Sequence, residues 1–275
     1  MKKLLNTIIL FLAFSINAQE NIKYQKPSKE ILDLVEFERP PSILYDENKN
    51  FMLFLFRDNY KSIAELSAKE LRLGGLRIDP KTNIGSRVTY YNNVKIRNLK
   101  NQNSEIIQVK GLPKNPKLSN ISWSPDQKRI ALTNTTETGV ELWVLELENG
   151  SVMKLTESNL NSNIGSVINW FSDSENMLVK MISNNRRPLI DTNKIVPDGP
   201  TISTNFGEKA QNRTYQDLLK NKFDEHNFEQ LSTSTIYKVS IDGSVKKWMD
   251  DGMYRTISFS PNGEYVMISQ INKPF

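Results

Sequence analysis

A short motif of apolar strand, tight turn and apolar strand recurs along this chain of 275 residues, and it constrains the fold more than any other feature. The two clearest copies are residues 121–132, ISWSPDQKRIAL, and residues 257–268, ISFSPNGEYVMI. A degenerate copy covers residues 168–179, and a fainter one covers residues 41–53. Pro125 and Pro261 preset φ at the second position of their turns, and Gly263 tolerates a positive φ. We therefore expect each copy to form a β-hairpin.

The spacing of these copies is typical of the four-stranded blades of a β-propeller. Trp123 and Trp170 are 47 positions apart, and Trp123 and Phe259 are 136 positions apart. The second distance is close to three periods of about 45 residues, the length of one blade. The third period contains an insertion, which displaces one copy. We expect an all-β fold, a partial β-propeller of about four blades over residues 40–275.

The best-defined blade lies between residues 121 and 156. Its expected strands are residues 121–124, 129–134, 140–147 and 151–156, with Asn149 and Gly150 in a hairpin turn. The third strand is apolar on both faces, with Val140, Leu142 and Val144 on one and Trp143, Leu145 and Leu147 on the other. This pattern is typical of a sheet that is covered on both sides, as propeller blades are.

Two segments interrupt the β pattern. An insertion from about Arg186 to Gln230 contains a capping box at residues 214–217, TYQD, and apolar residues at helical spacing after it. This pattern predicts a short helix that begins near Thr214. A second helix is expected from Ser62 towards Leu73. Residues 20–39 are polar with one apolar patch, and we expect them to form an N-terminal arm docked on the domain.

The N-terminus resembles a secretory signal peptide over residues 1–19. Lys2 and Lys3 precede a mostly apolar run from Leu4 to Ile16, and a small polar exit, Asn17 to Gln19, follows. The apolar run is shorter than the ~20 residues that span a bilayer, and the chain has no cysteine for a lipoprotein anchor. We expect an exported protein, periplasmic or secreted, without a stable membrane anchor.

Composition excludes several classes of function. Zero cysteines exclude disulfides, thiolate metal sites and a thiol nucleophile. The formal net charge is +5, and removal of Lys2 and Lys3 leaves 34 basic against 31 acidic residues, a net charge of +3. Because the basic residues are scattered among acidic ones, no nucleic-acid partner is expected. Nothing in the sequence points to a cofactor.

Catalytic and metal-binding patterns are absent from the sequence. It contains no Gly-x-Ser-x-Gly, the turn that exposes the serine of an α/β-hydrolase. His226 is the only histidine, and we expect an ordinary surface residue rather than a triad member or a lone metal ligand. Glu225 and Glu229, one helical turn apart, fit a solvated face better than an acid/base pair. Residues 46–50, DENKN, fit a turn better than a calcium loop. We therefore predict neither catalytic residues nor a metal site.

Two groups of side chains are weak candidates for binding. Arg186 and Arg187, at the start of the insertion, are able to bind a carboxylate in bidentate fashion, although surface arginines at a loop entrance are the simpler interpretation. The four tryptophans offer stacking surfaces for a sugar, but their positions in strands favour packing between blades. They are Trp123, Trp143, Trp170 and Trp248.

Several runs of the sequence resemble the propeller half of the S9 (prolyl oligopeptidase) serine peptidases, in particular the glutamyl endopeptidase branch of chloroplasts and bacteria. The runs are SIAEL at 62–66, ELRLGGLRI at 70–78, GVELWV at 139–144, VPDGP at 196–200 and RTYQDLLKN at 213–221. The last of these is the most specific, whereas the Ser-Pro-Asp-Gly repeat is common to many propellers. The resemblance extends from about Tyr24 to the end of the sequence.

The resemblance implies a role in proteolysis without catalysis by this chain. In that family an N-terminal propeller of about seven blades covers a C-terminal α/β-hydrolase domain and limits which peptides reach the catalytic Ser, Asp and His of that domain. The sequence has about four blades and no hydrolase part, so it offers no positions for those residues. We expect the propeller portion of an exported serine endopeptidase, which meets peptide substrates through the full-length enzyme. The alternative is a stand-alone periplasmic propeller that binds a protein or peptide.

Overall fold

The computed structural model describes residues 25–101, 103–196, 199, 202, 204, 206–209 and 214–275. The chain divides into two units between Glu38 and Arg39. In the first unit, helix α2 (Lys29–Val35) follows Ser28 and has no buried side chain. The expected signal peptide at residues 1–19 lies outside the described residues, and the docking of the N-terminal arm stays a prediction.

The second unit contains three successive four-stranded antiparallel sheets. The first comprises β1 (Ser42–Tyr45), β2 (Phe51–Phe56), β6 (Asn93–Asn98) and β7 (Ile107–Gln108). The second comprises β8 (Leu118–Trp123), β9 (Arg129–Thr135), β10 (Val140–Glu146) and β11 (Ser151–Lys154). The third comprises β12 (Ile168–Trp170), β13 (Asn176–Ile182), β14 (Ser234–Ser240) and β15 (Val245–Gly252). A final pair, β16 (Tyr254–Phe259) and β17 (Val266–Gln270), follows.

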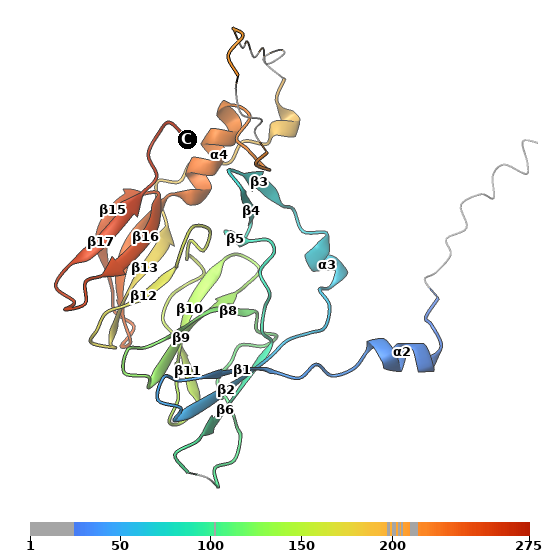
Figure 1. The fold of residues 1–275 in the computed structure, drawn as a ribbon, viewed down its shortest axis with the longest axis vertical. Coiled ribbons are helices and arrows are strands. Elements are labelled where there is room, and N and C mark those ends of the chain that lie inside the picture. Colours follow the sequence, from blue (N-terminus) through green and yellow to red (C-terminus); the bar gives the residue numbers. More distant parts are fainter. Residues whose placement is uncertain are drawn as a thin grey trace, which may run out of the picture. The chain divides into compact units, whose positions relative to one another are not determined.

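Within each sheet the strands follow one another in sequence order, as they do in a propeller blade (Figure 1). The all-β partial propeller expected from the sequence is therefore confirmed. Of the about four blades expected, the described residues form three with four strands each and a fourth unit with two.

The repeated hairpins owe their shape to a serine that opens each turn. In the β8–β9 turn, Ser124 Oγ donates to Asp126 Oδ1 at 2.6 Å and accepts from Arg129 N at 3.0 Å. In the β16–β17 turn, Ser260 Oγ donates to Asn262 Oδ1 at 2.7 Å and accepts from Tyr265 N at 3.0 Å. Gly263 has a φ of +72°, which glycine adopts without strain. The motif thus forms the same local structure at both places.

The core lies between neighbouring blades. Strand β10 contributes to both sides, as its sequence predicts: Val140, Leu142 and Val144 pack towards Met177 and Val179 of β13. Leu145, on the opposite face, packs in a second cluster with strands of the first blade. Burial of these apolar side chains contributes ~25 cal/mol for each Å² removed from water. It is the main favourable contribution to folding, because the chain contains no disulfide.

The first insertion connects β2 to β6 and differs from the prediction. The expected helix does begin here, with a capping box: Ser62 Oγ accepts from Glu65 N at 3.2 Å, and the Glu65 carboxylate accepts from Ser62 N at 3.0 Å. However, helix α3 (Ile63–Leu66) ends after four residues and does not continue towards Leu73. The chain instead forms a small sheet of β3 (Leu71–Leu73), β4 (Leu76–Asp79) and β5 (Ile84–Gly85).

The second insertion, residues 183–233, connects β13 to β14. Its helix differs from the one predicted to begin near Thr214. It contains a 3₁₀ turn, η2 (Thr192–Lys194), and helix α4 (Lys222–Ser232). The helix begins at Lys222 rather than near Thr214, because Asn221 is the residue that caps it. Asn221 Oδ1 accepts from Phe223 N and Asp224 N, both at 2.9 Å. Asp217, in the expected capping box, has a φ of +59° and is not helical.

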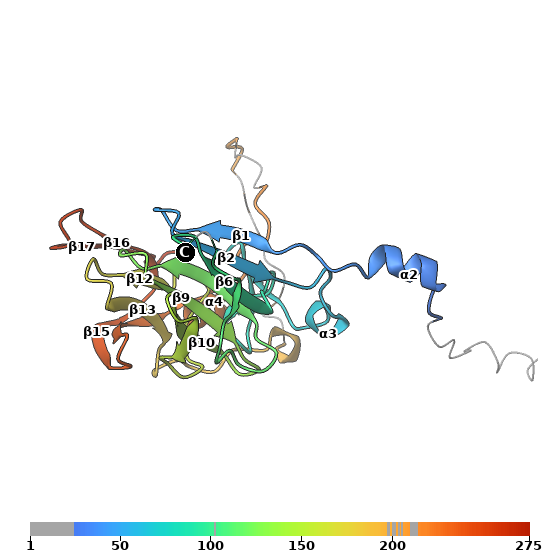
Figure 2. The ribbon, with the colours of Figure 1, turned by 90° about the horizontal axis from the view of Figure 1, so that it is seen from below.

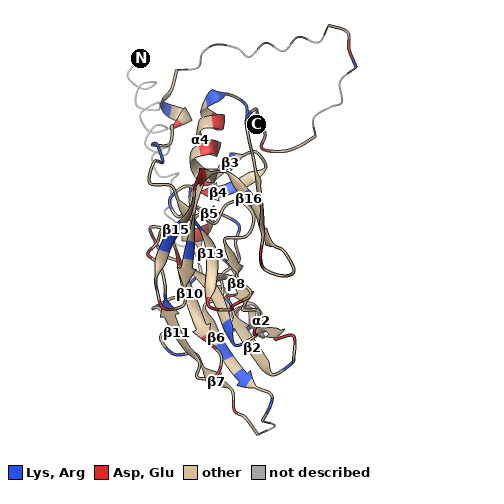
Figure 3. Ribbon diagram, turned by 90° about the vertical axis from the view of Figure 1, so that its left-hand side faces the viewer, with Lys and Arg blue, Asp and Glu red and all other residues tan. Residues whose placement is uncertain are grey.

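Both insertions leave from the same end of the sheets. Strands β2 and β13 are each the second strand of their blade, so their C-terminal ends point the same way in an antiparallel meander. The insertions meet where α4 packs on β3 and β4 through Leu73, Ile78, Phe228 and Leu231. Figures 1 and 3 show α4 beside β3–β5 from two directions, and Figure 2 shows the blades from below. We call this end of the sheets the insertion end.

Candidate functional site

The turn between β3 and β4 is shaped for a close approach to α4. Gly74 and Gly75 have φ values of +57° and +80°, which side chains disfavour. A Cβ atom at Gly74 would lie 3.1 Å from Cε2 of Phe228 on α4. Glycine is therefore favoured at position 74 for two reasons: the positive φ disfavours other residues, and a side chain would crowd the Phe228 ring.

Residues 215–219, which precede α4, lie against this turn. Gly75 N donates to the Asp217 carbonyl oxygen at 3.2 Å. Arg77 Nε lies 3.3 Å from Asp217 Oδ2, and Arg77 Nη2 donates to Gln216 Oε1 at 3.5 Å. The structure thus joins the two segments that carry the more specific parts of the family resemblance, although Arg77 and Gln216 are 139 positions apart in sequence.

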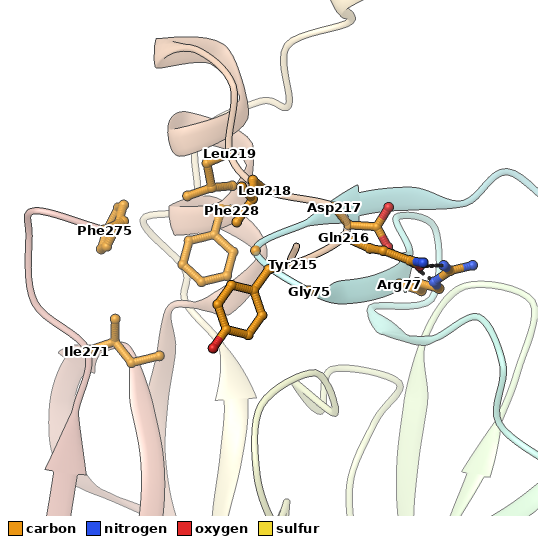
Figure 4. A pocket seen from close by; sticks show the side chains of 11 residues that line it. Gly75, Arg77, Tyr215, Gln216, Asp217, Leu218, Leu219, Phe228, Ile271 and Phe275 are labelled. Carbon is orange, nitrogen blue, oxygen red and sulfur yellow. Dashed lines mark hydrogen bonds and ion pairs between the residues drawn. The ribbon is translucent and has the colours of Figure 1, made fainter. Parts of the chain in front are cut away.

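A cavity of about 660 Å³ lies between the β3–β4 turn, residues 215–219, α4 and the segment after β17. Figure 4 shows its side chains, with Ile271 and Phe275 on one side, Arg77 with Gln216 and Asp217 on the other, and Tyr215 between them. The apolar lining residues are Leu218, Leu219, Phe228, Ile271 and Phe275. We call this space the insertion cavity.

The walls of the insertion cavity combine a packed side and an open side. The Phe228 and Phe275 rings meet edge to face, with centroids 5.4 Å apart. Tyr215, in contrast, is 82% exposed. Among the described residues that line the cavity there is neither a serine nor a histidine. Its mixed apolar and polar lining is suited to binding.

The two arginines expected as weak carboxylate binders do not line this cavity. Arg186 is half-buried, and burial lowers the pKa of its guanidinium. Arg187 is exposed, with Nη2 4.0 Å from Glu229 Oε2, and the same oxygen lies 3.0 Å from Lys273 Nζ. Carboxylate binding by Arg186 and Arg187 stays a prediction.

The other residues considered from the sequence are His226, the tryptophans and the turn at residues 46–50. His226, on α4, has Nε2 3.0 Å from the Pro188 carbonyl oxygen, a contact that ties the helix to the start of the insertion. Trp170 Nε1 donates to Ser122 O of the neighbouring blade at 3.2 Å, whereas Trp248 is 41% exposed. Asp46 Oδ1 accepts from Phe51 N at 2.6 Å and closes the expected turn at residues 46–50.

The described residues contain neither a candidate metal site nor a candidate membrane-spanning helix. In that part of the chain, no group of three or more His, Asp or Glu side chains is arranged to hold a metal ion. No helix there is long and apolar enough to cross a membrane.

Sequence reasoning missed the insertion cavity. It singled out residues 70–78 and 213–221 for their family resemblance, but gave no reason to place them together. One signal in the sequence was available. Both runs resemble the glutamyl endopeptidase branch in particular, whereas the Ser-Pro-Asp-Gly repeat is common to many propellers.

The sheets and their connections define the class of this chain as a partial β-propeller. The chain is 30% identical over 265 residues to the probable chloroplastic glutamyl endopeptidase of Oryza sativa subsp. japonica, covering 92% of this chain and 28% of that protein. It is 30% identical over 268 residues to the protein of the same name from Arabidopsis thaliana, covering 92% and 27%. It therefore spans less than a third of the curated relatives it matches.

A solved structure, the acylaminoacyl peptidase of Pyrococcus horikoshii, is 16% identical, covers 87% of this chain and 29% of that chain, and has a TM-score of 0.39. Because this score is low, the assignment rests on the sequence relatives. No family model matches the chain. These relatives confirm the resemblance of the chain to the propeller portion of the S9 (prolyl oligopeptidase) serine peptidases, and to their glutamyl endopeptidase branch in particular.

Proposed function

We propose that this chain is the non-catalytic propeller portion of an exported serine endopeptidase, and that it limits the access of peptides to an α/β-hydrolase domain. The observation that carries the proposal is its 30% identity, over nearly all of its own length, to two proteins named glutamyl endopeptidase. The insertion end supports a role in meeting peptides, since both insertions and the insertion cavity lie there.

The reading frame beyond Phe275 tests this proposal. We expect the frame to continue and to encode a Gly-x-Ser-x-Gly turn, followed by an aspartate and a histidine that complete a triad. A stop codon directly after Phe275 would contradict it and would favour the alternative, a stand-alone periplasmic propeller that binds a protein or peptide. The alternative has its own support in the insertion cavity, whose lining comes entirely from this chain.

Export is the first testable part of the proposal. The positive residues Lys2 and Lys3 and the apolar run from Leu4 to Ile16 lead us to expect a mature N-terminus between Ala18 and Glu20. N-terminal sequencing of the protein recovered outside the cytoplasm measures this directly. A soluble cytoplasmic form that keeps Met1 would show that residues 1–19 are not a signal peptide.

Absence of catalysis by residues 20–275 is the second testable part. Because His226 contacts the Pro188 carbonyl oxygen and no Gly-x-Ser-x-Gly occurs, we expect no reaction with a fluorophosphonate serine probe. We also expect no hydrolysis of peptides after glutamate. Mass spectrometry of the probe-treated chain is the measurement, with an active serine peptidase as the positive control. Stoichiometric labelling of one serine would reveal a nucleophile outside the usual turn.

A further inference from the structure

We propose that the insertion cavity binds a bulky, uncharged apolar side chain of an extended peptide. The inference rests on the proposed function, in which peptides meet the insertion end. It adds a subsite and a class of side chain to that function.

The size and lining of the cavity support an apolar ligand. Its volume of about 660 Å³ lies within the ~300–1,000 Å³ that small-ligand sites occupy. Phe228 and Leu219 form its inner wall, and Ile271 and Phe275 close one side. Tyr215 and Leu218 remain 82% and 38% exposed at its opening. An apolar side chain that enters would remove these surfaces from water, which is favourable in proportion to the area covered.

The charges in the lining favour an uncharged side chain. Arg77 and Asp217 are the only charged residues that the described lining contains, and they pair with each other at 3.3 Å. An acidic side chain in the cavity would have to compete with the Asp217 carboxylate for Arg77, and a basic one would have to compete with Arg77 for Asp217. Arg186 and Arg187, the candidates for carboxylate binding, lie outside the lining. The cavity is therefore suited to a peptide position other than an acidic one.

The distribution of polar groups favours a peptide over an apolar small molecule. Gln216 and Arg77 lie on one side of the apolar wall in Figure 4, with Tyr215 between them and that wall. A peptide presents backbone donors and acceptors next to each side chain, so it is able to satisfy such groups while its side chain fills the cavity. Gly75 adds room at the opening, because a Cβ at this position would meet nothing within 4 Å.

Photocrosslinking of the full chain tests the inference. The probe is a capped glycine–serine peptide with one central p-benzoyl-phenylalanine. We expect mass spectrometry to locate its crosslinks in residues 215–219 and 271–275. Unlabelled peptides with phenylalanine at the centre should suppress these crosslinks, whereas peptides with alanine or glutamate should not.

Two pairs of variants make the test specific. Tyr215→Ala removes an exposed ring from the opening, and we expect about fivefold weaker crosslinking from the loss of one aromatic contact. Tyr265→Ala is the matched control, since Tyr265 is 71% exposed in the β16–β17 turn and does not line the cavity. Leu218→Asp places a charge in the lining and should abolish crosslinking. Leu66→Asp, at a 70% exposed position on α3, should not.

The inference is overturned if phenylalanine and alanine peptides compete equally, if the crosslinks lie elsewhere, or if Tyr215→Ala crosslinks as well as the unmodified chain. Thermal melting of each variant separates loss of binding from loss of folding. These outcomes can be told apart from a failure of the proposed function. A reading frame without a hydrolase domain would refute that function and leave the crosslinking result intact, while failed crosslinking beside an intact frame would refute only the subsite.

Discussion

Replacement of Lys180 by methionine is expected to stabilise the propeller by about 2 kcal/mol or more at neutral pH, because it removes a buried charge. Lys180 lies on β13 and is 1% exposed. Its ammonium donates to the Ile164 carbonyl oxygen, the single hydrogen bond that the described residues give it, although an ammonium has three protons to donate. Burial lowers the pKa of Lys180 from 10.5 to about 8.

The direction of the pH dependence follows from this lowered pKa. Below pH 8 the folded and unfolded chains both carry the proton, so the full penalty of roughly 3 kcal/mol is present. Between about pH 8 and 10.5 the folded chain binds fewer protons than the unfolded chain, so the penalty falls as the pH rises. The stability difference between Lys180→Met and the unmodified chain should therefore shrink over this range.

Thermal melting at a series of pH values measures this difference. For a domain of this size, 2 kcal/mol corresponds to a shift of about 4–8 °C in the midpoint. Lys246→Met is the matched control, because Lys246 is an exposed lysine on β15, and we expect no such shift. An equal or lower midpoint for Lys180→Met at pH 7 would show that the ammonium contributes favourable contacts that burial alone does not account for.

Residues 20–275 are expected to self-associate when expressed alone. The first blade exposes Ile43, Leu44 and Tyr45 of β1, which are 46%, 37% and 50% exposed. At the other end, β17 pairs only with β16 among the described residues and exposes Met267 to 71%. Unpaired strand edges with apolar side chains are templates for pairing with another chain. We expect association at micromolar concentration, which corresponds to about 8 kcal/mol.

Size-exclusion chromatography at increasing protein concentration tests this expectation. Met267→Lys places a charge on the free edge and should reduce the associated fraction at least severalfold. Met153→Lys makes the same change at a 49% exposed position on β11, away from that edge, and should leave it unchanged. A sharp monomeric peak with a cooperative melt at every concentration would instead indicate a propeller that is stable with its end blades open.

Features that depend on neighbours in sequence could be predicted. The β8–β9 and β16–β17 hairpins form as expected, because Ser124 and Ser260 bond to residues within five positions of themselves. The expected helix start at Ser62 is also present, because Ser62 bonds to Glu65, three positions later. The two apolar faces of β10 correctly predicted a sheet covered on both sides. Successive side chains of a strand point to opposite faces, so the sequence shows directly which faces are apolar.

Features that depend on distant residues could not be predicted. One correction is local: the expected helix from Ser62 towards Leu73 stops at Leu66, because residues 71–73 pair with β4 a few positions later, across the turn at Gly74 and Gly75. The expected cap near Thr214 does not form, and Asp217 instead accepts from Gly75 and pairs with Arg77. At Asp217 a distant partner outweighs a local capping signal, which contributes only about 1 kcal/mol.

The sequence itself contains the strand–turn–strand repeats, their period and the specific runs at 70–78 and 213–221. These features were enough to predict a partial propeller and its resemblance to the S9 peptidases. The insertion cavity and the burial of Lys180 were decided by tertiary structure alone. The cavity exists only where a glycine turn, a segment 139 positions later and α4 come together. Lys180 is buried only because the strand that carries it is covered on both faces, and no local pattern records which polar residue such packing encloses.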